Sequence, residues 1–275
     1  MPPDLCDLHV HTTASDGIYP PERVVAEAAA AGLSAVAVTD HDTIAGIEPA
    51  LSAAGSVLVV PGLELGTIHR GAELHILGYW LDWRHPALNG ELERLVAARA
   101  RRTALMLERL RELGFPLTEA EVARQAGDAP PGRPHVAAAL VAQGYVKDVD
   151  RAFRELLGQG RPAYVPRLRH SPEEAVDLIR AAGGAAVLAH PGLYPAAAAE
   201  LLPRLVATGL AGVEAHYPAH DPGTEAWALE QCRRFGLVAT GGSDFHGPSR
   251  HGDAALGSCG VPAAAVAGLR QRAGG

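Results

Sequence analysis

Residues 4–11 read Asp-Leu-Cys-Asp-Leu-His-Val-His, a short apolar segment that finishes in two histidines. Its apolar residues are typical of a buried strand, and the following Pro20-Pro21-Glu22 is typical of a helix start. A second apolar segment at residues 35–39 indicates the next strand. This alternation predicts parallel strands joined by crossover helices, which is an α/β fold.

The same alternation continues toward both ends of the chain but is interrupted in the middle. Between residues 86 and 165, apolar residues recur at helical spacing and no strand is indicated. We therefore expect a barrel formed by residues 1–85 and 166–275, with a helical insertion at 86–165 that serves as a substrate cap. Further strands are expected at residues 57–64, 75–79, 185–189, 212–215 and 237–241.

The composition excludes several classes of protein. The chain has 275 residues, of which 48% are hydrophobic and 20% charged, so it can form a sizeable core. No apolar run reaches membrane-spanning length, and no signal peptide is indicated, so we expect no membrane association. The net charge of −7 argues against a surface that coats nucleic acid. Three widely spaced cysteines favour a reducing, cytoplasmic environment.

Histidines and acids cluster where the expected strands end. In parallel α/β folds ligands bind at the carboxyl ends of strands, so these side chains should converge. Residues at i and i+2 on a strand share a face, which lets His9 and His11 grip one cation from one side. The strand-end residues are His9, His11, Asp40, His41, Asp42, Glu64, His75, His190, His216, Asp244 and His246.

Histidine combined with carboxylate suits zinc, manganese or iron better than calcium. A carboxylate such as Glu64 can bridge two metals, and two or three divalent cations can clamp a phosphate and deprotonate a water molecule. A single histidine at a strand end is more often a surface or core residue than a ligand. Several independent strand ends that carry histidine with acidic partners favour the metal site instead.

Six motifs occur in chain order along the sequence. They are Asp7-Leu-His-Val-His-Thr12, Ser15-Asp-Gly17, Thr39-Asp-His-Asp-Thr43, Gly62-Leu-Glu64, Leu188-Ala-His-Pro191 and Gly242-Ser-Asp-Phe-His246. Together they resemble the PHP (polymerase and histidinol phosphatase) family, and in particular its TrpH/YciV-like branch. The resemblance implies a distorted (β/α)7 barrel with a trinuclear metal site. That branch includes 3′,5′-nucleotide bisphosphate phosphatases and 5′→3′ exoribonucleases that act on short RNA.

The resemblance also implies a set of metal ligands. Some relatives have a histidine where this chain has Asp16, which leaves the third metal open. His69 lies close enough in sequence to compete with His75, which we prefer because an alternating strand pattern follows it. The implied ligands are His9, His11 and Asp244 for the first metal, Glu64 as the bridge, His75 and His190 for the second, and Asp16, His41 and His246 for the third.

The resemblance favours a phosphatase that removes a phosphate from 3′,5′-bisphosphate nucleotides, for example adenosine 3′,5′-bisphosphate to AMP. It also allows 5′→3′ trimming of short single-stranded RNA. The alternatives are a histidinol-phosphate phosphatase, which would share the metal site, and a non-catalytic metal-binding module. The candidate catalytic residues are Asp244 and His216, the latter as leaving-group acid or as a residue at the substrate edge.

A substrate with two phosphates needs a second anion site. Arg133 and Arg161 lie on turns bounded by Gly and Pro, from which a guanidinium can present a rigid fork to a phosphate. The alternative is that both are solvated loop arginines. Tyr217 or Tyr164 could stack on a base. The arginines at 99, 101 and 102 are expected to form a solvated helix face.

Overall fold

The computed structural model describes residues 4–127, 131–248 and 254–274. Within these residues the central element is one eight-stranded sheet. Its strand order is β7-β6-β5-β4-β3-β2-β1-β8. The strands are β1 (Leu5–Val10), β2 (Ala35–Val38), β3 (Leu58–His69), β4 (Ala72–Tyr79), β5 (Ala185–Leu188), β6 (Gly212–His216), β7 (Val238–Gly241) and β8 (Val261–Pro262).

Two parallel groups make up most of the sheet, β1–β2–β3 and β5–β6–β7. Their strands are short and apolar because they are buried on both faces, as in other parallel sheets. One buried cluster joins Leu8, Leu77 and Val187 from β1, β4 and β5, and another joins Val36 of β2 with Val24 of helix α1 (Pro21–Ala30).

The sheet curves until its first strand meets the segment that follows β7. Val10 forms an isolated parallel bridge with Phe245, and the backbone N–H of His11 donates to the carbonyl of Phe245 at 2.9 Å. The sheet is therefore nearly closed into a barrel, and the expected distorted α/β barrel is confirmed. Near-closure also brings the carboxyl ends of β1 and β7 together.

One feature of the strand pattern differs from the expectation of parallel strands throughout. β4 pairs antiparallel with β3 over the whole length of β4, from Gly62–Tyr79 to His69–Ala72. The two residues between them, Arg70 and Gly71, both have positive φ (48° and 85°), which suits a tight hairpin turn. A two-residue turn leaves no room for a crossover helix, so β4 runs against its neighbours β3 and β5.

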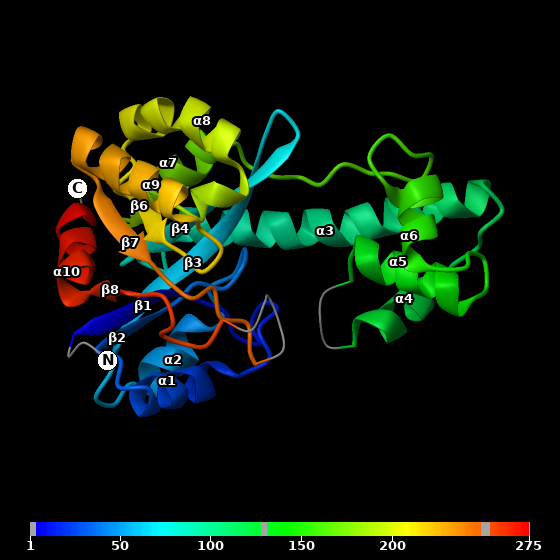
Figure 1. Cartoon of the computed structure of the whole chain (residues 1–275). Coiled ribbons are helices and arrows are strands. Elements are labelled where there is room, and N and C mark those ends of the chain that lie inside the picture. The colour runs from blue at the N-terminus through cyan, green and yellow to red at the C-terminus, as the bar shows by residue number, and fades with distance from the viewer. Residues whose placement is uncertain (1–3, 128–130, 249–253, 275) are drawn as a thin grey trace. The chain divides into compact units, whose positions relative to one another are not determined.

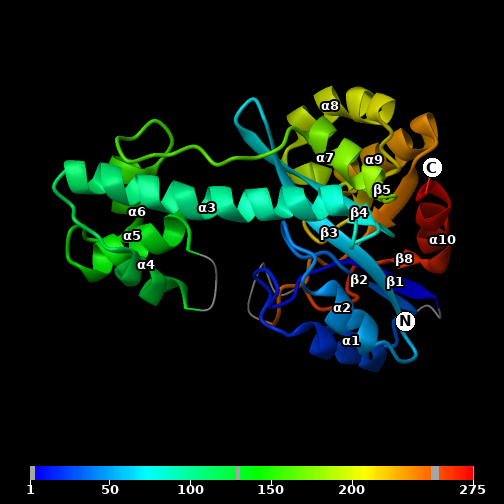
Figure 2. The same cartoon turned by 180° about the vertical axis from the view of Figure 1, so that it is seen from behind.

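Helices cover the outside of the curved sheet. α1 and α2 lie beside β2 and β3, and α7 and α9 lie beside β4 to β7, as both views show (Figures 1 and 2). These helices and 3-10 turns are α1 (Pro21–Ala30), α2 (Ile47–Ser52), α7 (Pro172–Ala181), η2 (Pro191–Leu193), α8 (Pro195–Thr208), α9 (Pro222–Phe235) and α10 (Ala263–Arg272).

The chain divides into two compact units, residues 1–90 with 169–275, and residues 91–168. The second unit is helical and has its own core, in which Met106 and Leu110 pack with Val136, Leu140 and Leu157. Helix α3 begins before this unit and continues into it, and the expected limits of the insertion, residues 86–165, stay a prediction. The remaining helices are α3 (Pro86–Glu112), α4 (Glu119–Ala126), α5 (Arg133–Ala142), α6 (Val149–Ala152) and the π-turn η1 (Phe153–Leu157).

Among the described residues, no helix combines the length and apolar character needed to cross a membrane. The helical unit's expected role as a substrate cap stays a prediction.

Candidate metal centre

Within the part of the chain that the structure describes, nine residues with metal-binding side chains come together in the first unit. Their nitrogen and oxygen atoms form overlapping groups in which all candidate ligand atoms lie within 4.8 Å of one another. The structure thus brings together every ligand that the sequence predicted. They are His9, His11, Asp16, His41, Glu64, His75, His190, Asp244 and His246.

Glu64 of β3 lies at the centre of this cluster and is buried. Its Oε2 is 2.9 Å from Nδ1 of His41, 3.3 Å from Nε2 of His11 and 3.4 Å from Nε2 of His9. His9 and His11 come from the end of β1 and His41 from beyond the end of β2. One carboxylate oxygen therefore lies close to imidazoles from two neighbouring strands.

The other oxygen of Glu64 faces a second pair of histidines. Oε1 lies 2.8 Å from Nδ1 of His75 and 3.1 Å from Nε2 of His190. His69 lies apart from them, with Nε2 at 3.4 Å from Oε1 of Glu200. The geometry therefore places His75, and not His69, in the cluster, in agreement with the preferred alternative.

Asp244 is the second carboxylate of the cluster. Its Oδ1 lies 3.2 Å from Nε2 of His11 and 3.4 Å from Nε2 of His9. Its Oδ2 accepts a hydrogen bond from the hydroxyl of Tyr217 at 3.0 Å. The aspartate is thus shared between two imidazoles and a phenol, which fixes the direction of both oxygens.

Asp16 lies at the more open side of the cluster, with 44% of its side chain exposed. Its Oδ1 is 3.2 Å from Nε2 of His246 and 3.7 Å from Nδ1 of His11, whose ring stacks on that of His246 at 4.0 Å. A ligand atom of His41 lies within reach of the same three side chains. Asp16 is the exposed member of this group, while His11 and His246 are buried, so the group is open to solvent on the side of Asp16.

The atoms at the centre fit divalent cations. Nδ1 of His9 lies 3.0 Å from Oε1 of Glu214, so in the neutral ring Nδ1 carries the proton and Nε2 presents a lone pair. That lone pair faces Oε2 of Glu64, another acceptor, and among the described residues neither atom has a hydrogen-bond partner. Buried acceptors that face each other are costly unless a cation lies among them. Imidazole and carboxylate together suit zinc, manganese or iron.

The electrostatics of the cluster favour positive charge within it. Burial opposes ionisation of Glu64, yet the surrounding histidines hold the pKa of its carboxyl well below the ordinary value. Burial likewise opposes a charged His75, but Glu64 and Glu73 raise the pKa of that imidazole to about 10. Protons and metal cations therefore compete for the same nitrogen atoms, because a ligating imidazole must be unprotonated on the ligating atom.

Two further buried acids hold the loops that carry the ligands. Asp7 accepts from the hydroxyl of Ser243 at 2.6 Å and from the N–H of Gly257 at 2.8 Å. Asp40 accepts from the N–H of Thr12 at 2.8 Å and the hydroxyl of Ser15 at 2.6 Å. Burial raises the pKa of Asp7 to about 6, although these hydrogen bonds lower it in part. Both acids stabilise the backbone of segments next to the cluster.

Two of the clustered residues have a left-handed backbone. His190 has a φ of 22° and Asp244 a φ of 53°, values that non-glycine residues rarely adopt. His190 lies two residues after the end of β5 and Asp244 three residues after the end of β7, where the chain turns away from the sheet. Backbone strain of about 1–3 kcal/mol per residue persists when surrounding contacts enforce it, and it is concentrated at functional sites.

Sequence reasoning missed two residues that contact the cluster or its neighbours. Glu214 of β6 is buried and touches His9, and Arg169 forms an ion pair with Asp42 at 2.6 Å. Glu214 could have been found from its position in the apolar strand Gly-Val-Glu-Ala-His, since a charge buried in a strand needs a partner. Arg169 had no comparable signal.

His216, the predicted catalytic residue at the end of β6, and Tyr217, the predicted substrate-binding residue that follows it, lie in different surroundings. Nδ1 of His216 is 3.0 Å from Oε1 of Glu225, and about a third of its side chain is exposed. The ring of Tyr217 lies 5.2 Å from that of His190, and its hydroxyl bonds Asp244. Tyr217 therefore directly contacts the cluster of nine candidate ligands, which we call the metal-type cluster. Base stacking by the ring of Tyr217 stays a prediction.

The predicted phosphate-binding arginines belong to the helical unit. The guanidinium carbon of Arg133 lies 5.1 Å from the ring centre of Phe153 and 5.7 Å from that of Tyr164, and Arg161 is exposed at a turn. Arg102, expected on a solvated face, instead donates to the carbonyl of Val165 at 2.7 Å, because the chain segment returning from the unit packs against α3.

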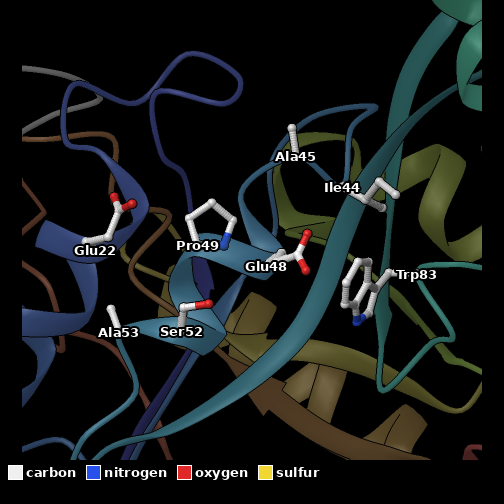
Figure 3. Close-up of a pocket in the computed structure, with 8 residues that line it drawn as sticks. All are labelled: Glu22, Ile44, Ala45, Glu48, Pro49, Ser52, Ala53 and Trp83. Atoms are coloured by element: carbon white, nitrogen blue, oxygen red, sulfur yellow. The ribbon is translucent and has the colours of Figure 1, made fainter.

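A separate open pocket of about 680 Å³ lies among α1, α2 and the segment before α3 (Figure 3). No residue of the metal-type cluster lines it. On its rim the guanidinium of Arg84 stacks on Trp83 at 4.1 Å and pairs with Glu48 at 3.2 Å. Its lining residues are Glu22, Ile44, Ala45, Glu48, Pro49, Ser52, Ala53 and Trp83.

Similarity to known proteins extends over nearly the whole chain. Residues 7–115 match the PHP domain. The 5′-3′ exoribonuclease Rnm of Escherichia coli (strain K12) is 36% identical over 260 residues, covering 88% of this chain and 85% of that protein. The 3′,5′-nucleoside bisphosphate phosphatase of Chromobacterium violaceum is 35% identical over 260 residues, covering 90% and 88%. A crystal structure from Bifidobacterium adolescentis matches with a TM-score of 0.79 at 32% identity, covering 98% and 96%.

Proposed function

This chain belongs to the PHP family, and from that membership we propose that it is a metal-dependent phosphatase that removes one phosphate from 3′,5′-bisphosphate nucleotides. The observation that carries the proposal is the buried cluster in which the single carboxylate of Glu64 touches five imidazoles. The Chromobacterium violaceum relative supports the substrate class.

Two or three divalent cations, chosen among manganese, zinc and iron, are the proposed cofactors. When bound, they supply Lewis acidity toward phosphoryl oxygens and lower the pKa of water. The protein's part is to fix the donor atoms in a buried, shaped site. The proposed ligand sets are His9, His11 and Asp244; His75 and His190, with Glu64 between these two sets; and Asp16, His41 and His246.

His216 is the proposed source of the proton that the leaving group takes up. Glu225 accepts from its Nδ1, and this contact would orient the ring and favour the imidazolium, the form in which Nε2 also carries a proton that it can donate. The hydroxyl of Tyr217 would donate to Asp244 and hold its carboxylate in one orientation during the reaction.

The second phosphate of the substrate would be held by Arg133 and Arg161. The helical unit, residues 91–168, carries 13 of the chain's 24 lysines and arginines but 10 of its 31 acids, although the chain as a whole is acidic. This local positive charge suits an anionic substrate. It also favours a second candidate function, trimming of short RNA from its 5′ end, which is supported by the exoribonuclease relative.

We expect the metal-reconstituted protein to release phosphate from adenosine 3′,5′-bisphosphate with a kcat/KM at least about tenfold above that for histidinol phosphate. Charge-assisted hydrogen bonds to a second phosphate contribute roughly 1.5–3 kcal/mol each, and about 1.4 kcal/mol is tenfold. A 5′-phosphorylated oligoribonucleotide in the same assay measures RNA trimming. Higher kcat/KM for histidinol phosphate would refute the bisphosphate assignment, and metal uptake without phosphate release would favour a non-catalytic module.

Replacing Arg133 or Arg161 with alanine should raise KM for the bisphosphate about tenfold and leave KM for a simple monophosphate nearly unchanged. The reason is that only the bisphosphate uses the second anion site. Arg124→Ala, which removes an exposed arginine from α4 of the same unit, is the matched control and should change neither KM. Equal effects on both substrates would remove the second-anion-site proposal.

A further inference from the structure

Glu214 is a buried carboxylate whose two oxygens each contact a histidine of the metal-type cluster. It lies in the middle of β6 with no exposed surface. Oε1 is 3.0 Å from Nδ1 of His9, and Oε2 accepts from the backbone N–H of His190 at 2.7 Å. His9 belongs to β1 and His190 follows β5, so Glu214 links two ligands that are far apart in the sequence.

The contact with His9 determines which nitrogen of that ring is free. A carboxylate can only accept, so in the neutral ring Nδ1 must donate and Nε2 must present its lone pair. Nε2 is the atom that faces Glu64 and Asp244, at 3.4 Å from each. A carboxylate behind a ligating imidazole is a known way to fix the tautomer and orientation of the ring.

The contact with His190 involves its backbone N–H rather than its ring. His190 has the unusual φ of 22°, and its ring presents Nε2 to Glu64 at 3.1 Å. A hydrogen bond from its N–H to a buried carboxylate is stronger than one between neutral groups, so it can help to hold a strained conformation. The rings of His9 and His190 lie nearly parallel, with centroids 5.6 Å apart.

Asp7 offers a contrast within the same barrel. It is equally buried and accepts from the backbone N–H of His9 at 3.3 Å, but its shorter hydrogen bonds come from Ser243 and Gly257, which are not proposed ligands. Asp7 therefore contacts only the backbone of a proposed ligand, whereas Glu214 contacts the ring of His9 as well as the backbone of His190. This difference is the reason to assign Glu214 a role beyond packing.

We infer that Glu214 is a positioning residue that sets the tautomer of His9 and the backbone of His190, and thereby controls metal affinity. The inference rests on the proposed function, since it requires that these histidines bind metal. Glu214 itself contacts neither substrate nor the facing ligand atoms; it acts through the two histidines.

The isosteric variant Glu214→Gln separates this role from packing. The N–H of His190 is always a donor, so the amide oxygen must turn toward it. The amide NH2 then faces Nδ1 of His9 and forces that nitrogen to accept, which moves the ring proton to Nε2. The volume of the side chain is preserved, while the lone pair needed for metal binding is lost from the ligand atom.

We expect Glu214→Gln to bind zinc about 10–100-fold more weakly than the wild-type protein, the usual effect of losing such a carboxylate. Calorimetric titration of the metal-free full-length chain and elemental analysis of its metal content measure this. Thermal unfolding of the metal-free proteins is the parallel control and should differ little between them. Equal zinc affinity in the two proteins would overturn the inference.

A second measurement needs no variant at this position. In the zinc-loaded wild-type protein, long-range ¹H–¹⁵N correlation spectra of labelled histidines should show the His9 proton on Nδ1. A proton on Nε2 of His9 would overturn the inference even if Glu214→Gln failed to fold. If the wild-type protein took up no zinc, manganese or iron at all, the proposed function itself would fail, which is distinguishable from failure at Glu214 alone.

Discussion

Replacing Glu64 with glutamine should abolish the binding of at least one metal ion per chain and lower kcat for phosphate release by at least about 100-fold. The substitution keeps the shape of the side chain but removes the charge that the five imidazoles share. The amide must also direct its NH2 at one group of these histidines, where it can donate but cannot bind a cation. Elemental analysis and single-substrate kinetics measure the two effects.

The matched control is Glu200→Gln, which removes another carboxylate that pairs with a histidine. Oε1 of Glu200 lies 3.4 Å from Nε2 of His69, outside the cluster. This variant should keep full metal content and activity. Treatment of the wild-type protein with a chelator should reproduce the loss seen in Glu64→Gln, and added manganese or zinc should restore activity only in the wild type. Full metal stoichiometry in Glu64→Gln would contradict the central place given to this residue.

Most of the candidate ligands could be predicted because their signal is local. His9, His11, His41, His190 and Asp244 lie at or just beyond the ends of apolar runs, and the parallel arrangement of their strands brings such ends together. Asp16 follows no such run and was implied only by the resemblance to the PHP family. His9 and His11 also share one strand face by their spacing alone. The choice between His75 and His69 was less secure from sequence, since it depended on the register of a hairpin.

The antiparallel β3–β4 pair shows what local patterns leave open. A strand pattern gives no direction, and the expectation of parallel strands came from the neighbouring strand–helix units. The direction is decided by Arg70 and Gly71, whose positive φ angles allow a two-residue turn. Arg-Gly is a weaker turn signal than Asn-Gly, so the hairpin was not anticipated.

Pairs of charged residues that are far apart in the sequence could not be predicted from the sequence. Glu214 and His9 are 205 residues apart, and Asp42 and Arg169 are 127 residues apart. No periodicity connects such positions, because only the closing of the barrel brings them together. A buried acid in an apolar strand indicates that a partner exists, but it does not identify that partner.

The ion pair between Asp42 and Arg169 supports the second large prediction, which concerns stability. Their side chains are only 8% and 6% exposed, and Nη1 of Arg169 lies 2.6 Å from Oδ2 of Asp42. Gly66 allows this approach, since a Cβ there would lie 2.2 Å from the same nitrogen. We expect Asp42→Asn to lower the free energy of unfolding by about 3 kcal/mol, because it leaves a buried guanidinium without its closest anion.

Asparagine is the informative substitution at this position. Asp42 has a φ of 52°, which asparagine tolerates better than alanine, so the variant changes charge with little added backbone strain. Its amide oxygen can still accept from the N–H of Gly66, as Oδ1 of Asp42 does at 3.1 Å. The expected loss is at the lower end for a broken buried pair, because Glu73 still contacts Arg169 at 2.9 Å. Urea unfolding of the metal-free chain measures it.

Two companion variants test whether burial is the cause. Glu48→Gln breaks an ion pair with Arg84 whose side chains are 67% and 71% exposed, and it should cost no more than about 1 kcal/mol. Adding Arg169→Met to Asp42→Asn removes the stranded charge and should restore part of the lost stability, because an apolar replacement of a buried pair is often nearly neutral. If Asp42→Asn and Glu48→Gln cost the same, desolvation of Arg169 does not control the stability of this region, and the loop that carries His41 must be held by its backbone contacts instead.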